Sequence, residues 1–114
     1  MDMVSVAGNI AVEQEMPYED RKVPVTIHEM LAATVEAYPS EDAVTFQLLS
    51  GPADKAETLS WAEFYAPFCQ CANLFRSLGV VERDVVPLVL PNANEMAISL
   101  IGGMIAGIVN PPSK

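Results

Sequence analysis

The C-terminal part of the sequence contains a spacing typical of phosphate-binding loops. Gly102 and Gly107 are arranged as G-x-x-x-x-G, a spacing in which backbone N–H groups can wrap an anion. In such a loop a Lys and a Ser or Thr follow the second glycine and hold the phosphate and its magnesium. Here Ile108 and Val109 follow instead. Because the ammonium and the hydroxyl are missing, we expect these glycines to serve packing and helix capping.

The thiol and imidazole groups are the other candidates for chemistry. Cys69 and Cys71 are the two cysteines, and on a helix residues two apart point about 200° away from each other. They cannot share a metal or form an unstrained disulfide there, so we interpret them as small apolar residues of a reduced, cytoplasmic protein. His28 lies beside Glu29 and off the apolar stripe of its helix, which is typical of a solvated surface side chain. The sequence thus predicts no catalytic, cofactor-binding or metal-binding residue.

The charge distribution argues against one class of partner. The 114 residues include fifteen acidic and six basic side chains, for a net charge of -9, although 51% of the residues are hydrophobic. Residues 1–60 hold eleven acidic and three basic residues, whereas residues 61–114 hold four and three. Nucleic acid needs a basic face, and the basic residues do not cluster beyond Arg21-Lys22. We therefore expect no nucleic-acid partner.

Two segments need to be distinguished from targeting or membrane segments. The N-terminus has Asp2 and no basic residue before its apolar residues, unlike a secretory signal, so we predict a flexible acidic leader over residues 1–25. The uncharged run over residues 96–109 is fourteen residues long, whereas a membrane span needs about 20. Its Gly103 and Gly107 fit G-x-x-x-G, a motif that counts only inside a full span. We expect a buried core helix here.

The first half of the chain predicts one helix and one hairpin. Thr26 and Glu29 form a capping-box pattern, and Pro39 ends the apolar stripe that follows at helical spacing. The stripe consists of Ile27, Met30, Leu31, Val35 and Tyr38. Residues 43–50 alternate in hydrophobicity, and a short strand pattern returns at residues 57–61. We predict an antiparallel hairpin over residues 43 to 60.

A second helix follows the hairpin directly. Ser60 and Glu63 repeat the capping box, and Gly79 stands where a left-handed C-terminal residue belongs. Pro67 removes one helical hydrogen bond and should kink the helix. The apolar face consists of Phe64, Phe68, Cys71, Phe75 and Leu78. Trp61 with Phe64 could stack on a base or ring, but aromatic residues at the start of an amphipathic helix are typical of a core.

The remaining residues predict a βαβ unit. Residues 85–90 are apolar at every position, which is typical of a strand covered on both faces. Pro87 indicates that this strand lies at an edge or contains a bulge. A strand parallel to it should begin at "IVNP", after Gly107 has ended the intervening helix.

The helix between these strands is predicted over residues 95 to about 106. Asn92 or Asn94 would cap it, and it is apolar nearly all round, as a buried crossover helix must be. Gly102 and Gly103 stand where a helix and a sheet could approach closely.

The motifs "TLSWAEF", "ANLFRSLGVVERDVV" and "VLPNANEMAISLIGGMIAGIVNP" occur in an order that resembles the N-terminal region of the adenylate-forming (AMP-binding) acyl-CoA synthetases and ligases. The resemblance covers residues 26–111. Arg83-Asp84 departs from the family's usual Gly-Asp, and "PSK" replaces the family's further N-P pair and long helix.

The resemblance implies an ATP-dependent ligase, in which a carboxylate attacks ATP to give an acyl-adenylate and coenzyme A then takes the acyl group. ATP, Mg2+ and coenzyme A are therefore implied for a full-length parent. The family's Ser/Thr/Gly-rich loop ending in Lys does not occur in this sequence, and Lys114 does not replace the family's mobile lysine. The resemblance thus implies no cofactor in this chain, which should not be catalytic alone.

We therefore predict an α/β chain: a partial N-terminal subdomain with an antiparallel hairpin, amphipathic helices and a βαβ crossover, incomplete without a larger layered fold. Residues 26–114 would be a truncated N-terminal portion of an AMP-binding ligase domain. Its expected partners are the remainder of that domain or further copies of itself, through exposed apolar surface. Two alternatives stay open, a free-standing α/β interaction module without catalysis and a membrane-associated helical protein.

Overall fold

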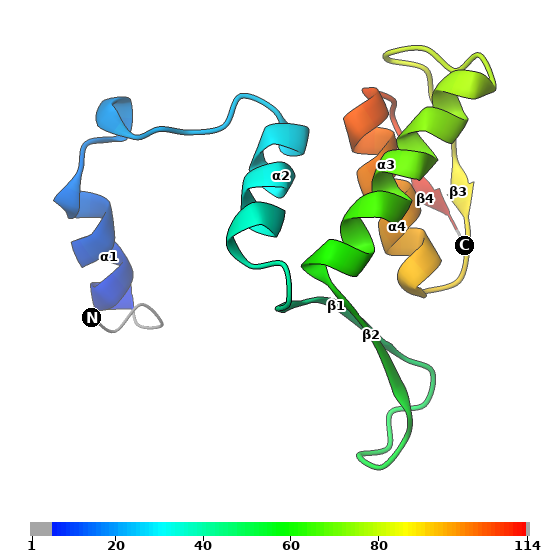
Figure 1. Cartoon of the computed structure of the whole chain (residues 1–114), viewed down its shortest axis with the longest axis horizontal. Helices are drawn as coiled ribbons and strands as arrows, with labels where there is room; N and C mark the ends of the chain where they lie inside the picture. Colours follow the sequence, from blue (N-terminus) through cyan, green and yellow to red (C-terminus); the bar gives the residue numbers. More distant parts are fainter. Residues whose placement is uncertain (1–5, 114) are drawn as a thin grey trace.

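The computed structural model describes residues 6–113, and Figure 1 shows them as a packed body with a separate N-terminal segment. The radius of gyration is 17.1 Å, whereas a compact domain of this length would have about 13 Å. The elements, in order, are α1 (Val6–Glu15), the 3-10 helix η1 (Tyr18–Asp20), α2 (Ile27–Ala37), β1 (Asp42–Gln47), β2 (Ala56–Ser60), α3 (Trp61–Ser77), β3 (Leu88–Val89), α4 (Asn94–Ala106) and β4 (Pro112–Ser113).

Side-chain caps fix the start of α2 and α3, as the sequence predicts. The Thr26 hydroxyl accepts a hydrogen bond from the Glu29 N–H at 3.1 Å. At α3, the Ser60 hydroxyl accepts from the Glu63 N–H at 3.3 Å, and the Glu63 carboxylate accepts from the Ser60 N–H at 2.9 Å. The Ser60 N–H and hydroxyl both donate to the Glu63 carboxylate, and these bonds lower the pKa of Glu63 because they stabilise its charged form. Both helices therefore begin where a free N–H finds a local acceptor.

Helix α3 runs unbroken through Pro67 and ends at a glycine. Gly79 has φ +81°, and the Val80 N–H donates to the Phe75 carbonyl at 3.2 Å, which closes the helix in a left-handed cap. The expected apolar face is wrong at its last member. Leu78 is exposed because the helix ends at Ser77, before Leu78 can turn toward the core.

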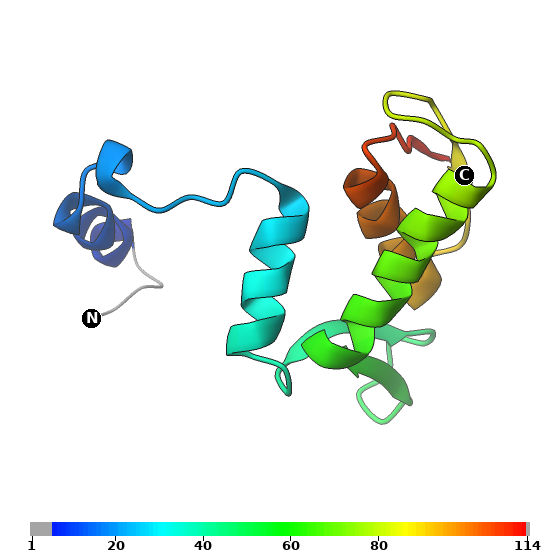
Figure 2. The ribbon, with the colours of Figure 1, turned by 45° about the horizontal axis from the view of Figure 1, so that its top comes forward.

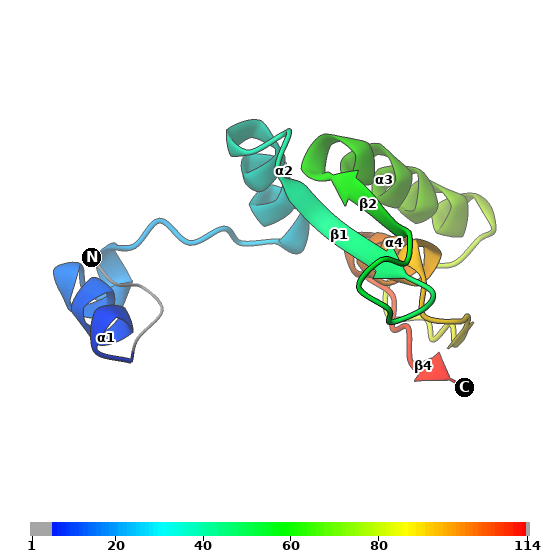
Figure 3. The same cartoon turned by 90° about the horizontal axis from the view of Figure 1, so that it is seen from below.

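The hairpin is confirmed, with β1 and β2 paired antiparallel and the Thr45 and Thr58 hydroxyls 2.8 Å apart. Figure 3 shows it crossing the ends of α3 and α4. The first strand ends earlier than predicted. It stops at Gln47, and Leu48 beyond it is exposed. The Gln47 side-chain amide donates to the carbonyls of Gly51 and Asp54, at 2.8 and 2.9 Å, and so holds the connecting loop against the end of the strand.

Strands β3 and β4 are parallel, as predicted for the two ends of a βαβ unit, and a further bridge joins Val85 to Val109. The expectation that both faces of residues 85–90 are covered is wrong for the described chain. Val85 and Val89 are 62% and 70% exposed, whereas Leu88, on the alternate side, is buried. Side chains alternate across a strand, and residues 6–113 supply a layer for one face only.

In the parallel pair, a side-chain donor takes the place of a backbone N–H group that proline lacks. In this register the Val86 carbonyl would accept from residue 111, and Pro111 has no N–H. The Asn110 side-chain amide donates to the Val86 carbonyl at 2.9 Å instead. Pro87 costs nothing in this pair, since Val86 and Leu88 are the residues that donate to the partner strand.

The core lies where α3 meets α4, α2 and the hairpin. Phe68 is 0% exposed, and the rings of Phe64 and Tyr65 meet it edge-on, with centroids 5.2 and 5.1 Å away. Leu31 of α2 joins this cluster, and Ala97, Ile98, Ile101 and Ile105 of α4 pack against it. Trp61 and Phe64 therefore belong to the core region and its edge, as predicted, rather than to an exposed stacking platform.

Helix α4 differs from expectation in two ways. Ala93 occupies the cap position without a side-chain bond, whereas Asn94, the first helical residue, is buried and donates to the Glu57 carbonyl at 3.4 Å. Asn94, one of the two residues predicted to cap α4, thus ties this helix to β2 instead. The helix is also only half-buried, because α3 and the hairpin cover one side of it. Within residues 6–113, no helix is long and apolar enough to cross a membrane.

Part of the expected leader has regular structure. Helix α1 and turn η1 stand apart from the body at the end of an extended segment (Figure 2). Arg21 links them, because its guanidinium donates to the Met16 carbonyl at 3.0 Å and to the Glu13 carbonyl. Those carbonyls lie at the C-terminal end of α1, where a cation is favourable.

Replacement of Ser60 by alanine should lower the free energy of unfolding by about 1 kcal/mol, because the Glu63 N–H loses its acceptor. The matched control is Ser77→Ala at the other end of α3, where the hydroxyl donates to the Leu74 carbonyl and caps no N–H. Chemical denaturation of both variants measures the difference in the free energy of unfolding.

The pKa of Glu63 is lowered in the folded state. The stability that its carboxylate contributes is therefore present above its ordinary pKa and is lost as pH falls through the lowered value. The cost of Ser60→Ala should shrink in acid. Equal midpoints for the two variants at neutral pH would contradict this cap.

The uncovered apolar face of residues 85–90 should make the chain associate. We expect it to bind the dye ANS and to sediment as more than a monomer at micromolar concentration. Val89→Lys should reduce both signals, whereas Gln70→Lys, which adds the same charge on the exposed side of α3, should not. A sharp monomer that excludes the dye would show that this face is not available for association.

Candidate functional site

Gly102 serves the packing of α4 on α3. A Cβ at this position would stand 2.7 Å from the Cys71 Cβ and 3.0 Å from the Phe68 carbonyl oxygen, so only glycine lets the two helices come this close. The sequence predicted a close approach of this helix to a sheet. The neighbour is instead helix α3.

Gly103 and Gly107 complete the account of the glycine-rich segment. A Cβ at Gly103 would overlap the Asn110 amide, the group that bonds to Val86. Gly107 is left-handed, with φ +75°, and the Ile108 N–H donates to the Gly103 carbonyl at 3.1 Å. The prediction that these glycines serve packing and capping is therefore confirmed.

The two cysteines occupy different surroundings, as their spacing predicts, and both are free thiols. Cys71 faces Gly102 on α4, and burial raises the pKa of its thiol, although a hydrogen bond with Ser99 opposes this. Cys69 lies on another side of α3 and lines an open groove. Burial also raises the pKa of Tyr65, and the neighbouring Cys69 adds to this effect.

His28 is exposed, as predicted, but it is not purely solvated. Its Nε2 atom lies 3.3 Å from the Tyr65 hydroxyl, and the two rings are 6.2 Å apart. The contact joins the first turn of α2 to the second turn of α3. His28 therefore faces α3 across the groove that Cys69 lines.

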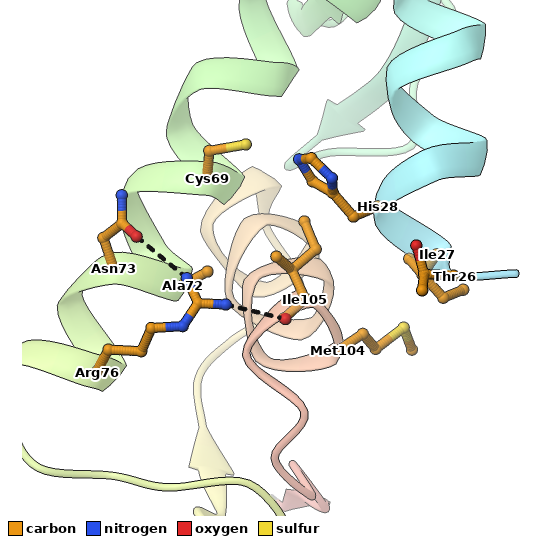
Figure 4. A pocket seen from close by; sticks show the side chains of 9 residues that line it. All are labelled: Thr26, Ile27, His28, Cys69, Ala72, Asn73, Arg76, Met104 and Ile105. Atoms are coloured by element: carbon orange, nitrogen blue, oxygen red, sulfur yellow. Dashed lines mark hydrogen bonds between the residues drawn. The ribbon is translucent and has the colours of Figure 1, made fainter.

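This groove, between α2, α3 and α4, is the candidate functional site (Figure 4). Its volume is about 510 Å³, and its lining consists of Thr26, Ile27, His28, Cys69, Ala72, Asn73, Arg76, Met104 and Ile105. Arg76 donates to the Asn73 side-chain oxygen at 3.1 Å and to the Ile105 carbonyl at 3.2 Å. The second bond places a cation at the C-terminal end of α4, where the helix dipole favours it.

The chemistry that this lining permits is limited. It contains one guanidinium, one imidazole and one thiol, and no carboxylate. Arg76 is held by its own helix and by α4, and the His28 ring contacts a tyrosine rather than a nucleophile. Among the described residues, no group of three His, Cys, Asp or Glu side chains could hold a metal ion. The groove is a mixed apolar and cationic surface, which suits binding better than catalysis.

Sequence reasoning missed this groove. Its lining comes from three helices that are far apart in the chain. Asn73 and Arg76 lie in the stretch "ANLFRSLGVVERDVV", whose pattern indicates a family resemblance but no binding site. The one available signal was the spacing of Cys69, Asn73 and Arg76, which share a helix face.

The chain is similar in sequence to parts of proteins that are named as ligases. A family model described as "AMP-binding enzyme" matches residues 31–112. Long-chain-fatty-acid–AMP ligase FadD26 of Mycobacterium marinum is 32% identical over 98 residues, which are 85% of this chain and 16% of the relative. Marinolic acid–CoA ligase of a Pseudoalteromonas species is 30% identical over 99 residues, which are 86% of this chain and 15% of the relative.

A solved structure is also similar to this chain. The inhibitor-bound N-terminal domain of FACL13 from Mycobacterium tuberculosis superposes with a TM-score of 0.62 at 26% identity, over 78% of this chain and 21% of that one. The chain thus spans about one sixth of the length of the curated relatives it matches.

Gly103→Ala should cost about 1–3 kcal/mol of stability, because the new methyl group displaces the Asn110 amide and leaves the Val86 carbonyl without its donor. A double-mutant cycle with Asn110→Ala tests the reason. In the Asn110→Ala background the added methyl group has room, so Gly103→Ala should cost clearly less. If the cost is the same in both backgrounds, the two residues do not interact as described.

Proposed function

The chain belongs to the AMP-binding enzyme family, and on that premise we propose that it is the N-terminal scaffold portion of an ATP-dependent, acyl-adenylate-forming ligase. The observation that carries this proposal is the βαβ unit. The inner face of its strands is buried at Leu88, whereas the outer face is exposed. Val85 and Val89 present an apolar face, and β3 and β4 pair over two residues each. Such a unit is suited to continue into a larger sheet.

The remainder of the ligase domain is the partner that this scaffold would need. Strand β3 pairs with β4 on one edge, and parallel sheets in proteins are normally covered on both faces. A following segment of the domain would cover Val85 and Val89 and extend the sheet beyond its two strands. We place this assembly in the cytoplasm, a proposal supported by the two free thiols.

The residues present do not fit ATP and magnesium. Gly102 and Gly103 are buried against Cys71 and Asn110, so their backbone cannot wrap a phosphate. Gly107 is followed by Ile108 and Val109, which offer neither an ammonium nor a hydroxyl group. The nucleotide and acyl sites of the proposed ligase would therefore lie outside this chain.

The reaction proposed for the complete ligase is acyl-adenylate formation. A carboxylate attacks the α-phosphate of ATP, and pyrophosphate leaves. Coenzyme A would then take the acyl group and release AMP. The Pseudoalteromonas relative is named as an acid–CoA ligase, which supports coenzyme A as the acceptor. This chain would support the folded domain in which those steps occur, and it would be inactive alone.

Calorimetry with millimolar ATP and magnesium should give no saturable heat with this chain, because Ile108 and Val109 follow Gly107 where a phosphate loop has a lysine and a hydroxyl residue. Gly107→Ala serves as the check on any heat that does appear. A saturable heat that this substitution abolishes would show that the glycine segment binds nucleotide, and the scaffold proposal would then be wrong in that respect.

Sequencing of the transcript tests the scaffold role itself. Sequencing through and beyond the codon for Lys114 should reveal a continuous reading frame that encodes a Ser/Thr/Gly-rich loop ending in Lys. A stop codon directly after Lys114 would contradict the proposal and favour a free-standing interaction module.

A further inference from the structure

The N-terminal segment carries apolar side chains that have nothing to pack against in the extended arrangement. Tyr18 is 69% exposed, and Met16, Val23 and Val25 are exposed as well. The bonds from Arg21 to the carbonyls of Glu13 and Met16 hold the end of α1 and η1 together as one unit. This preformed unit presents Tyr18 beside two carboxylates, Glu19 and Asp20.

The groove between α2, α3 and α4 has the complementary character. The chain as a whole has a net charge of -9, yet the groove lining contains Arg76 and His28 and no acidic residue. Ile27 and Met104 expose apolar surface at its edges. Arg76 uses Nη1 and Nη2 for its two bonds, and a guanidinium carries further N–H donors. An acidic segment with an aromatic anchor matches this surface in both charge and polarity.

The chain connectivity places the N-terminal segment next to the groove. The segment enters α2 at Thr26, which is itself part of the groove lining. Five residues, 21–25, separate η1 from Thr26, and a fully extended stretch of five residues spans about 17 Å. The Val25 N–H donates to the Glu29 carboxylate of α2 at 2.9 Å. A reversal of the chain at residues 22–24 would turn η1 toward the groove and leave this bond and the three helices unchanged.

We propose that residues 16–25 form a strap that closes over this groove, with Tyr18 inserted between α2 and α4 and the Glu19 and Asp20 carboxylates beside Arg76. The closed strap buries Tyr18 and the exposed parts of Ile27 and Met104, which favours closure through the hydrophobic effect. It also covers Cys69 and holds α2 against α3 in addition to the contact of His28 with Tyr65 and the packing of Leu31 against the core of α3. The structure shows the open arrangement, in which the strap points away from the body (Figure 1).

The thiol of Cys69 reports the state of the strap. In the 114-residue chain with Cys71→Ser, the rate at which Cys69 reacts with a chromogenic disulfide reagent should rise about threefold on Tyr18→Ala, the change expected if the strap is closed about two thirds of the time. Asp20→Lys should act in the same direction, because it places a cation beside Arg76. Tyr38→Ala, which removes an equally exposed tyrosine at the far end of α2, should leave the rate unchanged.

Equal rates for the parent, Tyr18→Ala and Asp20→Lys would overturn the strap. Protection that disappears on tenfold dilution would also overturn it, in favour of a segment exchanged between copies of the chain. Should Tyr18→Ala fail to fold by circular dichroism, Tyr18→Cys provides a second readout. Under mild oxidation it should form an intramolecular disulfide with Cys69, detected by mass spectrometry, whereas Tyr38→Cys should not, and failure of the Tyr18→Cys bond to form contradicts the proposal.

Discussion

The close approach of α4 to α3 at Gly102 is the constraint on which the rest of the body depends. With no side chain at Gly102, the two helices can bury Phe68 completely between them. That contact fixes the position of α4 against α3. The position of the C-terminal end of α4 in turn sets where the strand after Gly107 pairs with β3. A larger residue at Gly102 would move α4 outward and carry β4 with it, because helix and strand are joined by a tight left-handed turn.

The N-terminus of α3 is the second point at which several elements meet. Its first N–H groups are all provided with acceptors: the Trp61 N–H donates to the Glu41 carbonyl and the Ala62 N–H to the Pro39 carbonyl, each at 3.0 Å, and Ser60 caps Glu63. Pro39 and Glu41 belong to the turn between α2 and β1. The start of one helix therefore fixes the hairpin and the end of α2, which explains why the capping box stands directly after β2.

The surfaces that remain uncovered divide into two kinds with different consequences. The outer face of residues 85–90 is apolar and strand-like, which suits continuation of a sheet in the ligase domain that we propose. The groove between α2, α3 and α4 is partly cationic, and it opens next to the point where the N-terminal segment joins the body. In our proposals the first surface would contact the rest of the ligase domain, and the second would contact residues 16–25.

The sequence by itself determined the elements whose signals are local. The caps at Thr26 and Ser60, the left-handed glycines 79 and 107, and the alternation of the hairpin each depend on residues within a few positions of one another. The tertiary structure alone decided which apolar residues are buried, because burial depends on a partner layer. Val89 and Leu88 are equally apolar in sequence, but residues 6–113 cover only the side on which Leu88 lies. It also decided that Asn94 ties α4 to β2, that Gly102 faces a helix, and that Arg76 and His28 line one groove, since each requires the packing of segments distant in the chain.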